Sequence, residues 1–182
     1  MMQAVKKQMW FVLAAIALIM MVTPASHAQL NSGASTVALN ATLGESLTLS
    51  VSAASVNFTL VPSGTANGST PVGITTTWVL GTARTSLNVY AYFSSGNALT
   101  DGTNNIPTSS FNGSINGGAY SAFTGGSGPF GTNSKVIFTS ALGAGALNSS
   151  HVDSLGLQID TTGLNLPSST YTGTLNVQAQ VI

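Results

Sequence analysis

The stretch YTGTLNVQAQV, residues 171–181, indicates the fold of this chain most directly. From Leu175 onward every second residue is apolar, and polar residues fill the positions between them. An alternation of period two is typical of a β-strand with one buried and one solvated face. The same alternation recurs at residues 37–43, 47–53, 56–60, 87–93, 136–138 and 155–159. These stretches predict an all-β chain.

Turn sequences separate the alternating stretches. Pro-Ser-Gly stands at residues 62–64, and Asn-Gly or Asp-Gly pairs stand at 67–68, 101–102, 112–113 and 116–117. Pairs of this kind close β-hairpins because both residues tolerate a positive φ. Short strands with such regular punctuation predict an antiparallel sandwich of two sheets.

The N-terminus has the pattern of a secretory signal peptide. Lys6 and Lys7 precede an unbroken apolar stretch at residues 9–22, and small residues at 26 and 28 form a cleavage site near Ala28. A transmembrane helix needs about 20 apolar residues, so this stretch is short for an anchor. We therefore expect a protein secreted to the periplasm, cell surface or medium of a bacterium, with no membrane anchor after cleavage.

The rest of the chain, residues 29–182, is expected to form one domain. Its length is enough to bury roughly 70% of the unfolded surface without disulfides, and the chain has no cysteine. Residues 99–131 are dense in Gly, Asn and Ser and show no clear period. We interpret this region as a long, loop-rich excursion with one hairpin.

Ionisable side chains are scarce after the leader. The charged ones are Glu45, Arg84, Asp101, Lys135, Asp153 and Asp160, and His151 is the one histidine. Acid–base, metal and thiol chemistry need such groups held close together. We therefore expect no enzymatic activity, no metal and no cofactor. Two basic residues neutralise too few phosphates for nucleic-acid binding.

The closing segment, residues 167–182, resembles the last strand of bacterial immunoglobulin-like surface domains. More narrowly, it is similar to the spore coat protein U-like and chaperone–usher pilin families, in which a Gly/Ser/Pro turn leads into Tyr-x-Gly-x-Leu-x-Val. That motif stands here at Tyr171, Gly173, Leu175 and Val177. The resemblance implies an immunoglobulin-like antiparallel β-sandwich that acts as a pilus-like or surface subunit. Its expected partners are copies of itself, related subunits and a periplasmic chaperone.

Residues 36–43 form a second uncharged alternating stretch, with Val37, Leu39, Ala41 and Leu43 on one face. Two interpretations stay open: a strand within its own sheet, or a strand donated to a neighbouring subunit. Edge strands are usually protected by Lys, Pro or inward charges, and these strands have almost none. Donation would involve this face together with the C-terminal residues Tyr171, Leu175, Val177, Val181 and Ile182.

Aromatic residues supply a second candidate site. In residues 87–93 the apolar alternation leaves Asn88, Tyr90 and Tyr92 on the other face. Together with Trp78 they would form a platform on which sugar rings or a protein stack. The alternative is an aromatic pair that stabilises the sheet, or burial of both faces.

Three further motifs have simple structural explanations. His151 and Asp153 share a face but lack the further donors of a metal site, so a solvated loop pair is expected. Residues 101–105 hold oxygen donors in a tight turn without the distal Glu of a calcium loop. Gly-Gly-Ser-Gly-Pro at 125–129 fails the nucleophile-elbow pattern because its last position is Pro.

The sequence thus predicts a secreted, non-enzymatic structural or adhesive subunit that assembles by β-strand addition. The alternative is a monomeric carbohydrate-binding sandwich that uses the exposed aromatic residues.

Overall fold

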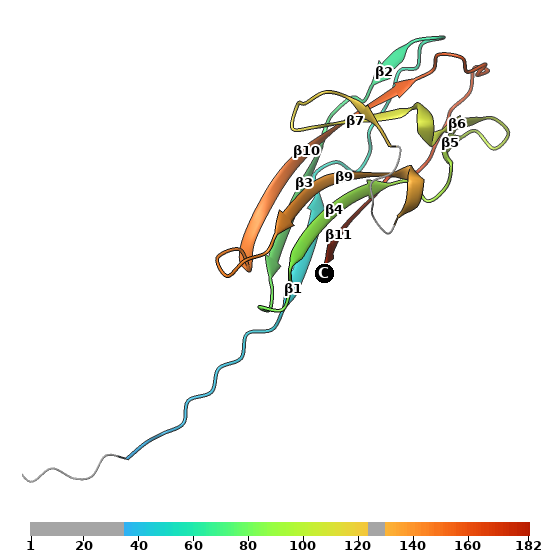
Figure 1. Cartoon of the computed structure of the whole chain (residues 1–182). Coiled ribbons are helices and arrows are strands. Elements are labelled where there is room, and N and C mark those ends of the chain that lie inside the picture. Colours follow the sequence, from blue (N-terminus) through green and yellow to red (C-terminus); the bar gives the residue numbers. More distant parts are fainter. Residues whose placement is uncertain (1–34, 124–129) are drawn as a thin grey trace, which may run out of the picture. The chain divides into compact units, whose positions relative to one another are not determined.

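The computed structural model describes residues 35–123 and 130–182. It divides the chain into two units, Met1–Ala41 and Thr42–Ile182. In the described part of the first unit, residues 35–41, there is neither helix nor strand. The predicted signal peptide lies outside the described residues. All strands of the described residues belong to the second unit (Figure 1).

The second unit is built almost entirely of short strands, with two 3₁₀ turns, η1 (Thr108–Ser110) and η2 (Gly131–Asn133). In chain order the strands are β1 (Ser46–Val51), β2 (Thr65–Asn67), β3 (Val72–Val79), β4 (Ser86–Tyr92), β5 (Asn97–Thr100), β6 (Asn105–Pro107), β7 (Phe111–Ile115), β8 (Ser121–Ala122), β9 (Ser134–Ala141), β10 (Asn148–Asp160) and β11 (Asn176–Val181). Within the described ranges, no helix is long and apolar enough to cross a membrane.

The larger sheet has the strand order β1-β3-β10-β7-β8, and β2 pairs with the far end of β10. Every pairing is antiparallel. Strand β10 organises this sheet because its 13 residues are long enough to pair with β3 along one half and with β7 and β2 along the other.

The smaller sheet has the order β11-β4-β9 and is also antiparallel. Strand β4 lies at its centre, and a register shift between Val89 and Tyr90 marks a bulge opposite β9. A separate hairpin, β5–β6, lies beside the sandwich and is joined to the C-terminal segment by a bridge between Thr100 and Thr172.

The core lies between the two sheets. Ile74 of β3 and Leu155 of β10 are fully buried and face Val89 of β4 across it. Phe93, Phe111 and Phe123 fill one end, with ring centroids 4.8 and 5.3 Å from Phe93. This confirms an all-β fold of packed antiparallel sheets. The immunoglobulin-like strand order stays a prediction.

Several details differ from the sequence expectations. Residues 36–43 form no strand, because a strand needs a hydrogen-bonded neighbour and these residues have no such pairing. Residues 56–60 form only a bridge between Phe58 and Gly68. The loop-rich excursion contains two hairpins, β5–β6 and β7–β8, where one was expected. The sequence pattern did not predict strand β3, because a polar residue, Thr76, occupies a buried position at which the alternation requires an apolar residue.

Candidate functional site

One edge of the sandwich is open. Strand β1 ends the larger sheet and β11 ends the smaller one, and the two strands lie close together (Figure 1). Leu47 and Leu49 of β1 point inward but are only half-buried, as are Val177 and Ala179 of β11. Inward residues of the central strands are fully buried. Within the described residues of the unit Thr42–Ile182, the sandwich therefore lacks a cover along this edge.

The incomplete cover extends beyond the two strands. Residues that pack on the core but stay partly exposed continue on both sides of the edge, at Leu49, Ala53, Val56, Phe58 and Leu60 on one side and at Leu164, Leu166, Tyr171, Leu175, Val177 and Ala179 on the other. Tyr171 and Leu175 precede β11, and the Tyr171 hydroxyl donates to the Pro167 carbonyl at 3.0 Å.

The open edge carries no charge. Its two sides are formed by residues 46–63 and 161–182, and the only ionisable side chain in these two stretches is that of Tyr171. One acidic residue, Asp160, stands just before the second stretch. Edge strands of soluble proteins are usually defended by Lys, Pro or inward charges. Pro62 and Pro167 stand outside β1 and β11. Neither strand is therefore protected against pairing with another strand.

The ends of both edge strands are fastened to the loop between β3 and β4. Glu45, just before β1, forms an ion pair with Arg84 at 2.8 Å and accepts a hydrogen bond from the Gly81 N–H. These bonds, the Arg84 side chain first, lower the pKa of Glu45 to about 2. At the other strand, the Ile182 carbonyl accepts hydrogen bonds from the N–H groups of Thr85 and Ser86.

The alternating stretch at 36–43 presents its apolar face to solvent. Val37 is 81% exposed and Leu39 is 91% exposed. Leu43, at the start of the second unit, is 78% exposed. Large apolar side chains that are exposed in this way are costly in water. The described residues 35–43 contain no strand or bridge. Their donation to a neighbouring subunit stays a prediction.

The aromatic platform expected from the sequence is covered. Trp78 is buried, and its indole N–H donates to the Ala146 carbonyl at 2.7 Å. Phe130 stacks on Tyr92 with centroids 4.2 Å apart and meets the buried Tyr90 edge-on at 5.3 Å. The alternation placed these residues correctly on the outer face of β4. Phe130, distant in sequence, then covers that face, so the rings do not form an exposed stacking surface.

Asn88 is half-buried on the same outer face, paired in register with Gln180 and Thr139. Its neighbours are the polar side chains of two strands rather than a cavity. Asn88, Tyr90, Tyr92 and Trp78 are thus not brought together as one accessible site.

His151 and Asp153 lie in β10, where a solvated loop pair was expected. Asp153 is buried and accepts hydrogen bonds from the Asn116 side chain at 2.9 Å and from His151 at 3.2 Å. Phe138 stacks on the imidazole at 3.8 Å. No group of three or more metal-ligating residues occurs in the described ranges. The arrangement fastens the β7–β8 turn to β10, because Asn116 also accepts a bond from the Ser154 N–H.

The remaining motifs need little comment. Asp101 accepts hydrogen bonds from the N–H groups of Asn104 and Thr103, and these bonds lower its pKa to about 2. The expected turn is confirmed. Ser127 and its neighbours lie outside the described residues.

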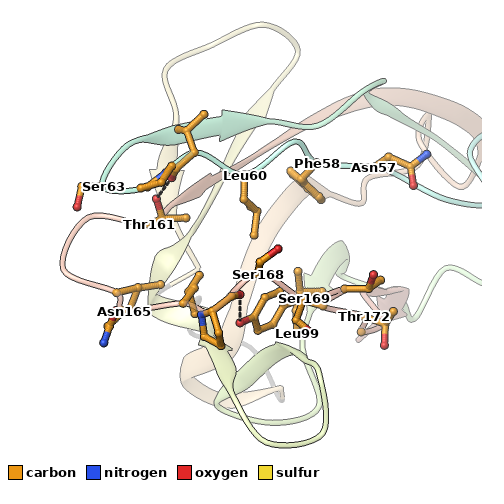
Figure 2. Close-up of a pocket in the computed structure, with 18 of the residues that line it drawn as sticks. Asn57, Phe58, Leu60, Ser63, Leu99, Thr161, Asn165, Ser168, Ser169 and Thr172 are labelled. Atoms are coloured by element: carbon orange, nitrogen blue, oxygen red, sulfur yellow. Dashed lines mark hydrogen bonds between the residues drawn. The ribbon is translucent and has the colours of Figure 1, made fainter.

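A pocket of about 900 Å³ lies beside the open edge, between residues 56–63 and 161–173. Figure 2 shows Phe58 and Leu60 extending from one segment toward Ser168 of the other. No sequence pattern indicates this pocket, because its two walls are irregular segments about a hundred residues apart, as the Thr161–Val61 hydrogen bond illustrates.

Comparisons with known proteins found no matching family model, curated protein or solved structure.

Proposed function

We propose that this chain is a secreted, non-enzymatic structural subunit of a surface fibre or coat. Subunits assemble by β-strand addition, with residues 36–43 of one copy entering the open edge between β1 and β11 of another. The observation that carries the proposal is the uncharged, half-covered edge between two strands that belong to different sheets.

The geometry of the two parts is complementary. Residues two apart on a strand are about 6.6–6.8 Å apart and face the same side. Four successive apolar side chains would therefore enter the open edge from one side of the inserted strand, those of Val37, Leu39, Ala41 and Leu43. The edge offers matching half-buried residues on either side, such as Leu49 and Val177. The inserted backbone would gain hydrogen bonds from the free edges of β1 and β11.

The energetic argument concerns both surfaces. Burying a large apolar side chain stabilises by about 1.5–3 kcal/mol relative to leaving it exposed. Val37, Leu39 and Leu43 are each exposed by more than three quarters, at 81%, 91% and 78%. Insertion would cover them together with the half-exposed core. The subunit interface would thus resemble the interior of a sandwich rather than a surface contact.

The composition supports an external, non-catalytic role. A surface rich in Ser, Thr, Asn and Gly stays hydrated without charge, and charged residues make up 4% of the chain. Such a surface changes little with pH or salt, because few groups titrate or are screened. An open edge also needs protection before assembly, so a periplasmic chaperone and related subunits are the expected partners.

The test is electrophoresis in SDS of the exported protein, unboiled and boiled, with electron microscopy of the same sample. We expect a heat-labile ladder and visible fibres. Leu39→Asp should abolish both, because a charge would enter the core of the next subunit. Asn40→Asp adds the same charge one residue further, on the opposite face, and should leave the ladder intact.

A single monomer band for the unsubstituted protein under both conditions would rule out this assembly. Equal ladders for the Leu39→Asp and Asn40→Asp proteins would show that residues 36–43 are not the inserted strand.

A further inference from the structure

The pocket lies beside the open edge and shares its lack of charged side chains. Nineteen residues line its volume of about 900 Å³, and none of them carries a charge at neutral pH. An anionic ligand would lose its hydration there without meeting a positive charge, which is costly, and the Asp101 carboxylate beside the lining residue Ser169 would repel it. The pocket therefore suits a neutral ligand, and its volume lies within the range of small-molecule sites.

The lining combines hydroxyl groups with apolar surface. Ser63, Ser168 and Thr172 contribute hydroxyls that both donate and accept hydrogen bonds. Phe58, Leu60 and Leu99 supply apolar surface between them (Figure 2). A sugar ring presents the same combination, with hydroxyls around its rim and apolar C–H groups on its faces. Aromatic rings such as that of Phe58 are common supports for those faces.

The walls are held in place by internal hydrogen bonds. Buried Thr161 bonds through its hydroxyl to the Val61 and Gly64 carbonyls, and its N–H donates to the Gly64 carbonyl at 2.8 Å. On the facing wall, the Tyr171 hydroxyl holds the Pro167 carbonyl. Ligand sites are usually formed before the ligand arrives, and these bonds provide that order.

The same walls are poorly suited to an added strand. Pro62 and Pro167 have no N–H to offer, and the Pro167 carbonyl is already bonded. Only isolated bridges, at Phe58 and Thr172, give these segments any strand character. The pocket thus differs from the β1–β11 edge, which offers two regular strands.

We infer that this pocket binds a neutral oligosaccharide. The subunit would then carry a glycan site at the end of the sandwich away from its C-terminus (Figure 1). This binding does not depend on assembly, because no residue of the stretch 36–43 lines the pocket. It also places sugar recognition away from the covered rings of Tyr90 and Tyr92.

The test is an array of neutral gluco-, manno- and galacto-oligosaccharides, with sialylated and uronic-acid oligosaccharides printed beside them. The exported protein should bind neutral members only, with affinity then measured by calorimetry. Ser168→Trp fills the pocket from an exposed position and should weaken binding by about tenfold or more, about 1.4 kcal/mol. Ser109→Trp, exposed on η1 and outside the pocket, is the matched control and should bind normally.

Unchanged melting temperatures of both variants show that the fold is intact. The inference is overturned if no neutral oligosaccharide binds, if acidic ones bind better, or if Ser168→Trp binds as tightly as Ser109→Trp. It is equally overturned if the pocket binds a synthetic peptide of residues 36–43, shown by peptide binding that Ser168→Trp abolishes and Ser109→Trp does not. The SDS ladder reports assembly separately, so failure of one proposal leaves the other standing.

Discussion

The two long edges of the sandwich are finished in opposite ways. At the edge formed by β8 and β9, Lys135 extends from one sheet and its ammonium group donates to the Ser121 hydroxyl at 2.6 Å and to the Ser121 carbonyl at 3.2 Å on the other. Phe123 is fully buried beneath this strap. Strands β1 and β11 themselves contain no charged side chain, and the Glu45–Arg84 ion pair lies just before β1 begins. The fold can evidently close an edge, so the open one is a property of its particular residues.

The largest difference between the edges should appear on removing an aromatic ring from each. Phe123→Ala should lower the free energy of unfolding by about 3–5 kcal/mol, because it leaves a cavity in the closed core. Phe58→Ala, on the open side, should cost less than half of that, since Phe58 is already partly exposed. Urea unfolding in a Leu39→Asp background measures each subunit alone. Equal losses would show that the edges are equally well packed.

The second effect concerns the fastening of the β7–β8 turn. Asn116→Asp removes the amide that donates to the buried Asp153 and sets two carboxylates together. We expect a loss of about 1–3 kcal/mol at neutral pH. Asn105→Asp, exposed in the β5–β6 hairpin, is the control. Chemical denaturation at pH 7 tests this, and similar losses for both variants would contradict it.

The smallest effect concerns the hydrogen bonds from the Lys135 ammonium group to Ser121. Burial lowers the pKa of Lys135 in the folded protein from 10.5, so the unfolded state binds more protons in the window just below that value. Stability therefore rises with pH through this window. Lys135→Met keeps the apolar stem and lacks the ammonium group, so its stability should change by about 1 kcal/mol or less at pH 7.

In thermal melts from pH 7 to 10.5, the stability of the unsubstituted protein should rise with pH relative to that of the Lys135→Met variant. Parallel profiles would mean that the ammonium group is not desolvated at this edge.

These regions also differ in how far the sequence predicts them. The alternation placed β4 and β11 on the correct faces, because an uninterrupted apolar period survives into the fold. It missed β3, where Thr76 occupies a buried position. The missing charges of the open edge are visible in the sequence, since they depend on composition alone.

What the sequence does not reveal are long-range pairs. The cover of Phe130 over Tyr92, the bond between Lys135 and Ser121, and the two walls of the pocket each join residues that only the fold brings together. The exposed platform was expected because the outward direction of Tyr90 is a local property, whereas its burial is decided by a distant loop.

The fastening of Glu45 and Ile182 to one loop has a mechanical consequence. The chain enters β1 beside Arg84, and β11 ends on Thr85 and Ser86. Tension applied along a fibre of such subunits would reach both edge strands at the same place and run parallel to them. All hydrogen bonds of an inserted strand would then be loaded in shear and at once, rather than one after another. In a fibre assembled as proposed above, this loading would make the subunits harder to pull apart than if the bonds broke one after another.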